Sequence, residues 1–141
     1  DGDGVDDATE IANGGDPLHV TSLAVNDVSI PRPTSGSTGV ATFTVTLQYP
    51  TGTQTVTVHY NTLDGTATSA GPSGKRDFDA VADAVLTFPP GTTTQTVSIT
   101  VRDGTESGRQ ANGTNEFFSV VLNSATNATI SDSTGVGTFN P

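Results

Sequence analysis

The sequence predicts an all-β fold, an antiparallel two-sheet sandwich of about seven strands with a short acidic loop segment at its amino terminus. Two observations support this prediction. From residue 18 onward, apolar residues alternate with Thr, Ser and Gln, which is typical of strands that bury one face. Turn-forming Gly, Pro, Asn and Asp separate these runs, and almost no segment has a helical pattern.

The opening ten residues, DGDGVDDATE, carry carboxylates at the spacing of a calcium-binding loop. In a twelve-residue EF-hand-type loop, oxygen ligands come from positions 1, 3, 5, 7, 9 and 12, with Gly at position 6. If Asp1 is loop position 3, the remaining ligands are Asp3, the Val5 carbonyl, Asp7 and Glu10, and Gly4 is at position 6. Because position 1 would precede Asp1, we expect a partial loop cut from a longer chain. The alternative is a solvated acidic tail.

Length and composition limit the classes of function. The 141 residues fit one domain with an appendage, and we divide them into a calcium-loop segment, 1–17, and a sandwich, 18–141. The net charge of −10 disfavours nucleic acid and anionic membranes and favours cations. With no cysteine there is no disulfide or thiolate site, and no apolar run is long enough to cross a bilayer. Abundant Thr, Gly and Asp with a single Lys predict an extracellular or cell-surface protein of a bacterium or archaeon.

The first predicted strand follows the acidic segment. Residues 10–13 favour one helical turn, closed by a pair of glycines. Residues 22–31 then alternate as a strand, with a bulge or bend expected at Asn26-Asp27.

Residues 40–49 and 54–60 have the clearest alternation and are separated by Pro-Thr-Gly. We expect these two runs to form an antiparallel hairpin. Their predicted inward residues are Phe43, Val45, Leu47 and Tyr49 in the first run and Val56, Val58 and Tyr60 in the second.

The second half of the chain alternates strands with two long polar loops, at 63–78 and 102–115. Loops of such length inside a compact domain are usually functional or mobile. The predicted strands are 85–88, 95–101 (Val97, Ile99 and Val101 inward), 116–122 (Phe118, Val120 and Leu122 inward), and 129–130 with 136–139.

Taken in order, several pieces of the chain resemble the Calx-beta domain. These pieces are VNDVSI followed by TSGSTG, ATFTVTL, VTVHYNTLDGTATS, RDF, LTFPPGTTTQTVSITV, NEFFSVVL and ATISDSTGVGTF. The resemblance covers residues 23–139 and implies an immunoglobulin-like sandwich whose loops at one end bind calcium. The opening segment separately resembles the aspartate-rich calcium repeats of thrombospondin type 3.

The resemblance implies metal ligands at one end of the sandwich, namely Asp77, Asp103, Glu106 and Glu116. Two departures affect this site. Arg32 stands where the family places a Glu, and the family's acidic run after the last strand is absent. We expect Arg32 either to repel the cation or to replace it by pairing with Asp77 or Glu116. The alternative is a loop end in which Arg32, Lys75, Arg76 and the carboxylates form salt links.

Other polar residues have simpler interpretations. Asp64 and Asp132 are expected to form turns, whereas Asp79 and Asp83 are expected to be solvated carboxylates. The two histidines, including His59 on the outward face of a strand, lie in no catalytic motif.

The sequence therefore predicts a non-catalytic, extracellular, calcium-binding structural or adhesion module of a larger cell-surface or matrix protein. Its expected partners are calcium ions and neighbouring domains or copies of the surface protein, without nucleic acid or membrane insertion. One alternative is a homopolymeric fibre subunit assembled by β-strand donation. The other is an accessory domain of a secreted enzyme.

Overall fold

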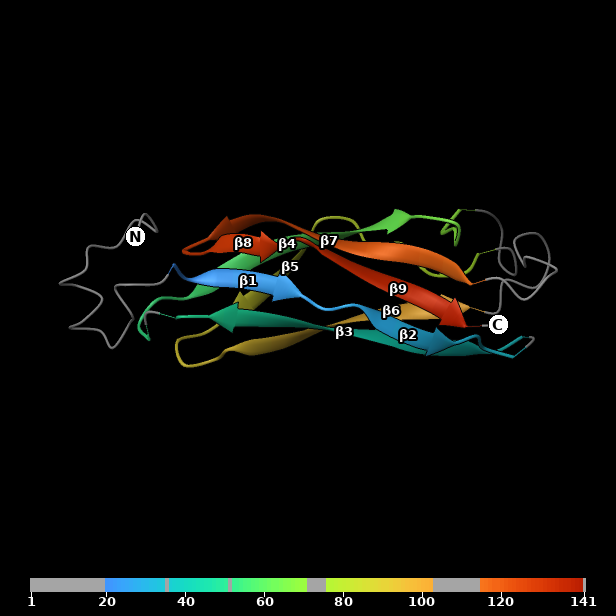
Figure 1. Cartoon of the computed structure of the whole chain (residues 1–141), viewed down its shortest axis with the longest axis horizontal. Coiled ribbons are helices and arrows are strands. Elements are labelled where there is room, and N and C mark those ends of the chain that lie inside the picture. Colours follow the sequence, from blue (N-terminus) through green and yellow to red (C-terminus); the bar gives the residue numbers. More distant parts are fainter. Residues whose placement is uncertain (1–19, 35, 51, 71–75, 103–114, 141) are drawn as a thin grey trace.

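Two packed sheets form the protein in the computed structural model, which describes residues 20–34, 36–50, 52–70, 76–102 and 115–140 (Figure 1). One sheet has the strand order β6-β3-β1-β8 and the other β2-β9-β7-β4-β5. The predicted two-sheet sandwich is confirmed. The nine strands of the described residues are β1 (Ser22–Val25), β2 (Val28–Pro31), β3 (Thr38–Gln48), β4 (Val56–Asp64), β5 (Ala84–Phe88), β6 (Thr94–Arg102), β7 (Glu116–Thr126), β8 (Thr129–Asp132) and β9 (Thr134–Asn140).

The sheets are mixed, so the prediction of purely antiparallel sheets was wrong. β1 lies parallel to β8, and β2 lies parallel to β9. The other strand pairs are antiparallel. Both parallel pairs join the first two strands to the last two. The alternation of residues along one strand cannot predict such long-range pairing.

The strand predicted over 22–31 is in fact two strands in different sheets. The division falls at Asn26-Asp27, where we expected only a bulge or bend. The Asn26 side-chain oxygen accepts a hydrogen bond from the Thr44 amide of β3 (2.7 Å), whereas Asp27 Oδ1 accepts one from the Val136 amide of β9 (2.9 Å). Each of the two side chains therefore fastens the chain to a different sheet.

The predicted hairpin of 40–49 with 54–60 does not form, because β3 and β4 belong to different sheets. The connection turns away from β3 through positive φ angles at Tyr49 (52°) and Gly52 (84°). Tyr49 is consequently 43% exposed rather than inward, and its carbonyl accepts a hydrogen bond from the Thr21 hydroxyl at 2.6 Å. Both strands bury one face against the same core, so the alternation gave no information about which sheet each joins.

The core lies between the sheets and is centred on Phe118 of β7. Its ring stacks on Phe78 (centroids 4.3 Å apart) and meets Phe43 of β3 edge to face at 5.9 Å. Gly137 of β9 allows this packing, because a Cβ there would lie 2.8 Å from the Phe118 ring. Apart from Tyr49 and the half-buried Tyr60, every residue predicted to point inward is buried.

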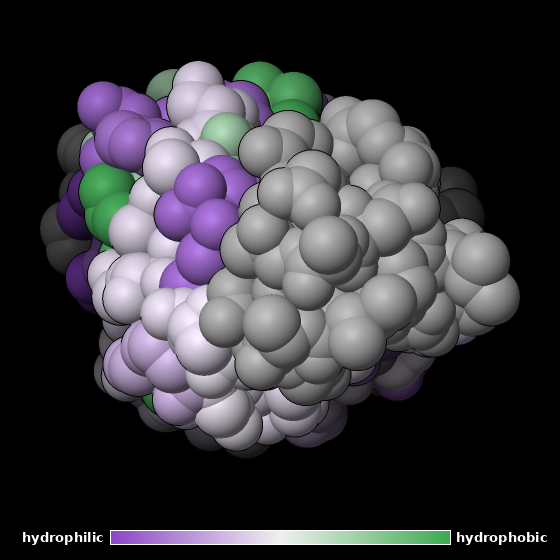
Figure 2. Space-filling view, turned by 90° about the vertical axis from the view of Figure 1, so that its left-hand side faces the viewer, coloured by the Kyte–Doolittle hydropathy of each residue, from purple (hydrophilic) through white to green (hydrophobic). Residues whose placement is uncertain are grey.

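The described chain enters and leaves the sandwich at opposite ends of its long axis. β1 begins at one end and β9 finishes at the other (Figure 1). At the entry end, the visible described surface is mostly hydrophilic or neutral, with small separated apolar patches (Figure 2). The described residues contain no helix long and apolar enough to cross a membrane. The predicted helical turn over 10–13 lies outside the described residues.

Candidate metal site

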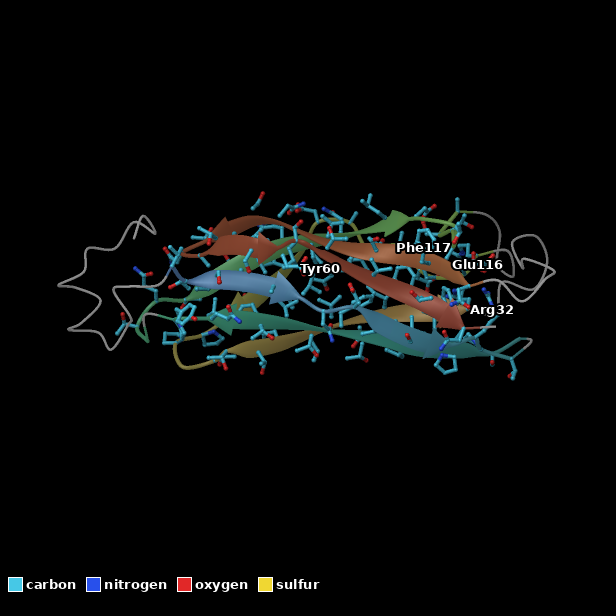
Figure 3. The ribbon with its side chains drawn as sticks, viewed as in Figure 1. Arg32, Tyr60, Glu116 and Phe117 are labelled. Atoms are coloured by element: carbon cyan, nitrogen blue, oxygen red, sulfur yellow. The ribbon has the colours of Figure 1, made fainter. Side chains whose placement is uncertain are left out.

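Two of the predicted ligands, Asp77 and Glu116, both contact Arg32. Arg32 and Glu116 lie at the end of the sandwich where β9 finishes (Figure 3). Both carboxylates are buried, with 1% of each side chain exposed. Arg32 Nη1 lies 3.4 Å from Asp77 Oδ1, and Nη2 donates a hydrogen bond to Glu116 Oε2. The prediction that Arg32 pairs with one of these carboxylates is confirmed for both.

Arg32 is positioned by the strands on either side of it. It follows β2, whose last residue Pro31 pairs with Asn140 of β9. The guanidinium lies over the Phe139 ring, with Cζ 4.9 Å from the ring centroid, which is a cation–π contact. Glu116 begins β7 directly opposite Phe139. Three strands thus hold the arginine and one of its carboxylates in place.

Asp77 is held by the 76–79 segment, which runs between β6 and the residues after β4. Its amide donates to the Thr68 carbonyl (2.8 Å), and its own carbonyl accepts from the Arg102 amide (2.7 Å). Its Oδ2 accepts from the Thr68 amide at 2.8 Å. The next residue, Phe78, anchors the segment because it is fully buried.

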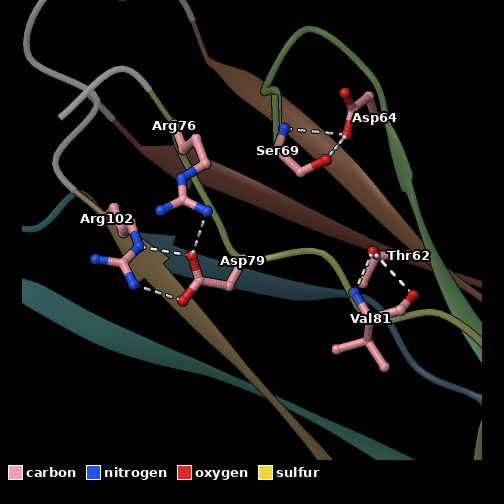
Figure 4. A network of polar contacts seen from close by, with 7 residues as sticks. All are labelled: Thr62, Asp64, Ser69, Arg76, Asp79, Val81 and Arg102. Atoms are coloured by element: carbon pink, nitrogen blue, oxygen red, sulfur yellow. Dashed lines mark hydrogen bonds and ion pairs between the residues drawn. The ribbon is translucent and has the colours of Figure 1, made fainter. Parts of the chain in front are cut away.

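Beside Arg32, Asp77 and Glu116, Asp79 forms a bidentate ion pair with Arg102 (Figure 4). Arg102 Nε and Nη2 each lie 2.6 Å from one carboxylate oxygen, and Arg76 Nη1 is 3.8 Å from Oδ1. The hydrogen bonds from Arg102 lower the pKa of Asp79, aided by the positive charges of Arg102 and Arg76 and opposed by burial. The expectation of an isolated, solvated Asp79 was therefore wrong. Sequence reasoning also missed Arg102, which ends β6 directly beside the 76–79 segment.

The described residues at this end do not fit a calcium ion. Calcium takes six to eight oxygen ligands, yet Asp77 Oδ1 and Glu116 Oε2 already face the guanidinium, and Asp77 Oδ2 accepts an amide. Of the four carboxylate oxygens, Glu116 Oε1 alone has no hydrogen-bond partner among the described residues. The described part of the chain contains no group of three or more Asp, Glu or His that could hold a metal ion. A nearby fixed positive charge further opposes a second cation.

The remaining predicted ligands lie outside the described residues and stay predictions. They are Asp1, Asp3, Val5, Asp7 and Glu10 in the opening segment, and Asp103 and Glu106 in the second long loop.

The turn residues behave as the sequence predicts. Asp64 Oδ1 accepts hydrogen bonds from the Ser69 amide (3.1 Å) and hydroxyl (2.7 Å), which close the loop after β4 (Figure 4). Asp132 Oδ1 accepts one from the Thr134 amide at 3.3 Å. His59 Nδ1 lies 2.7 Å from the exposed carboxylate of Asp83, which is therefore paired rather than simply solvated.

Fold and site together define a β-sandwich module that carries buried carboxylates at one loop end. A profile of the Calx-beta domain matches residues 20–138, and the chain belongs to that family. Calx-beta domains generally bind calcium. No curated protein matches the sequence.

Solved structures with the same fold include three from Calx proteins. The apo-form Calx CBD1 domain is 22% identical, with a TM-score of 0.62 over 84% of this chain and 96% of that chain. CBD12 from CALX1.2 is 19% identical, with a TM-score of 0.64, and 43% of that chain is covered. The Calx CBD2 domain is 14% identical, with a TM-score of 0.61. At these identities the likeness extends to the fold alone.

Proposed function

We propose that this chain is a non-catalytic structural module of a larger extracellular or cell-surface protein, and that it keeps the segments before and after it apart. The position of the first and last described strands is the observation that carries this proposal. Domain termini often lie close together, whereas here β1 starts and β9 finishes at opposite ends of the long axis (Figure 1). A module built this way acts as a spacer in a series of domains.

Calcium enters this proposal at the amino-terminal segment rather than at Asp77 and Glu116. The spacing of Asp1, Asp3, Val5, Asp7 and Glu10 supports a partial calcium loop. Bound calcium would neutralise the closely spaced carboxylates and stiffen the entrance to the sandwich.

Calorimetric titration of calcium into chelator-treated protein tests this site. We expect heat of binding and a raised melting temperature in the wild type, both abolished in Asp3→Ala/Asp7→Ala. The matched control is Asp83→Asn/Asp132→Asn, which removes the same two charges elsewhere. Asn tolerates the positive φ of Asp83 (50°) and keeps a side-chain oxygen in the Asp132 turn. The control should bind calcium as the wild type does. Absence of binding in the wild type would reject the calcium site.

Light scattering after size exclusion tests the spacer against a fibre subunit. Strand donation needs an accessible sheet edge. The edge strands β2, β5 and β8 have only four or five residues each, and the 76–79 segment bonds to the end of the longer edge strand β6. These edges support a monomer at all concentrations. A mass that grows with concentration would favour the fibre. An accessory domain of a secreted enzyme would give the same result as the spacer and is distinguished by its neighbouring sequence.

A further inference from the structure

We infer that the Arg32 guanidinium takes the place of a divalent cation at the exit end of the sandwich. The Asp77–Arg32–Glu116 cluster then closes this end without calcium. This inference is separate from the proposed calcium loop at the amino terminus, which involves other residues.

The charges of the cluster require a cation between the two carboxylates. Asp77 and Glu116 are each 1% exposed, and burying a carboxylate is costly unless it is paired and hydrogen-bonded. Arg32, itself 10% exposed, contacts both and supplies one positive charge against two negative ones. The cluster therefore keeps one net negative charge. One of its carboxylate oxygens, Glu116 Oε1, has no hydrogen-bond partner among the described residues. The carboxylates are thus arranged for a cation of higher charge than the one that holds them.

The geometry makes Arg32 and a metal ion mutually exclusive. One carboxylate oxygen from each partner faces a separate Nη atom, and the guanidinium lies over the Phe139 ring. An ion bridging Asp77 and Glu116 could use the unpartnered Glu116 Oε1, but on Asp77 it would compete with the guanidinium for Oδ1, because Oδ2 accepts the Thr68 amide. It would also lie directly beside the positive charge of Arg32. It would therefore have to expel a nearly buried arginine from three contacts.

The cluster also fixes where the chain leaves the module. Phe139, under the guanidinium, pairs with Glu116, and the following residue Asn140 pairs with Pro31. Arg32 therefore joins β2, β7 and β9 at the point of exit. The 76–79 segment is added through Asp77. The direction of the exit strand accordingly depends on an internal cation rather than on calcium concentration.

Thermal unfolding of the full chain tests the inference. The background is Asp3→Ala/Asp7→Ala, which removes the proposed amino-terminal site. With Arg32 present, we expect the same melting temperature in chelator and in calcium. Arg32→Gln should lose on the order of 10 °C in chelator, because two buried carboxylates are left unpaired. It should regain part of that loss in calcium, because the freed carboxylates can then bind the ion. The matched control, Arg102→Gln, removes the same charge from the more exposed pair with Asp79. Its melting temperature should fall less than that of Arg32→Gln, and calcium should not raise it.

If Arg32→Gln does not fold, a triple variant that replaces all three charged residues of the cluster still tests the inference. Arg32→Gln/Asp77→Asn/Glu116→Gln has no buried charge and should be more stable than Arg32→Gln. A triple variant that is no more stable would overturn the inference. So would an Arg32→Gln protein that keeps its melting temperature or that calcium does not stabilise. A third result would also overturn the inference. Calcium would raise the melting temperature of the background protein, and Glu116→Gln would abolish that rise, which would place the ion beside Arg32.

Discussion

At the scale of single residues, the ion pairs at the exit end differ in burial and therefore in what they contribute. Arg32 and its two carboxylates are nearly inaccessible, so loss of one partner leaves a buried charge behind. In the neighbouring pair, Asp79 is 34% exposed and Arg102 29%, so water screens their attraction. The first cluster should decide whether this end folds, whereas the second should modulate its stability with pH.

The Asp79–Arg102 pair should make stability depend on acid pH. Hydrogen bonds from Arg102 hold the pKa of Asp79 below its ordinary value of 3.8. A carboxyl with a lowered folded-state pKa stabilises the protein above that ordinary value, and the stabilisation disappears as pH falls through the lowered pKa. In urea unfolding, the wild type should be more stable than Asp79→Asn near neutral pH, and this difference should shrink below pH 3.8.

The control for this measurement is Asp132→Asn, which alters a carboxylate with no ion pair among the described residues. Like Asp79→Asn, it removes one negative charge, but it breaks no ion pair among the described residues. If the Asp79→Asn difference stayed constant down to strongly acid pH, the interpretation of this pair would be wrong.

At the scale of elements, β7 shows how the period of two decides burial. Phe118 points into the core, fully buried, whereas its neighbour Phe117 points outward and is 44% exposed. The same alternation in β3 and β6 places all predicted inward residues of these strands in the core. Alternation thus predicted faces correctly, but it gave no information about the sheet to which β3 and β4 belong.

Alanine substitutions of Phe118 and Phe117 in β7 compare the stability contributed by its inward and outward faces. Phe118→Ala should lower the free energy of unfolding by about 3–5 kcal/mol, because it opens a cavity between three other rings. Phe117→Ala should cost less than about 1 kcal/mol, since most of its effect is at the surface. Urea denaturation of both variants gives the comparison. Equal losses would show that Phe117 also packs in the core in solution.

At the scale of the whole molecule, the first and last described strands complete both sheets. β1 pairs with β8 in one sheet and β2 pairs with β9 in the other, so each sheet needs both halves of the chain. The Phe43–Phe118 contact joins the sheets across the core. Neither the early nor the late described strands complete a sheet by themselves.

We expect the protein to unfold in one cooperative step. Circular dichroism, which follows the strands, and tyrosine fluorescence, which follows Tyr49 and Tyr60, should give coincident urea transitions. The reason is that removal of either terminal pair of strands leaves both sheets incomplete. Separate transitions would mean that one sheet persists without the other, contrary to this topology.

The exit-end site was predictable in part. Asp77, Glu116 and the competing Arg32 were identified from the sequence, because the family resemblance gave the positions and the sign of each charge gave the conflict. Its geometry was not predictable. Arg32 and Glu116 lie 84 positions apart, and β-strand pairing alone brings them together. The bond from Arg102 to Asp79 was missed for the same reason, because the chain separates them by 23 positions.

The fold class, the inward face of most strands and the charges available at the loop end could all be predicted from the amino-acid sequence. These are local properties, set by the alternation of apolar residues and by the identity of each side chain. The remaining features follow from the three-dimensional packing. It divided 22–31 between two sheets, made two strand pairs parallel, separated β3 from β4, and placed Arg32 between both carboxylates. Each of these depends on contacts between residues far apart in the chain, where pairing is chosen by the packing of the whole core.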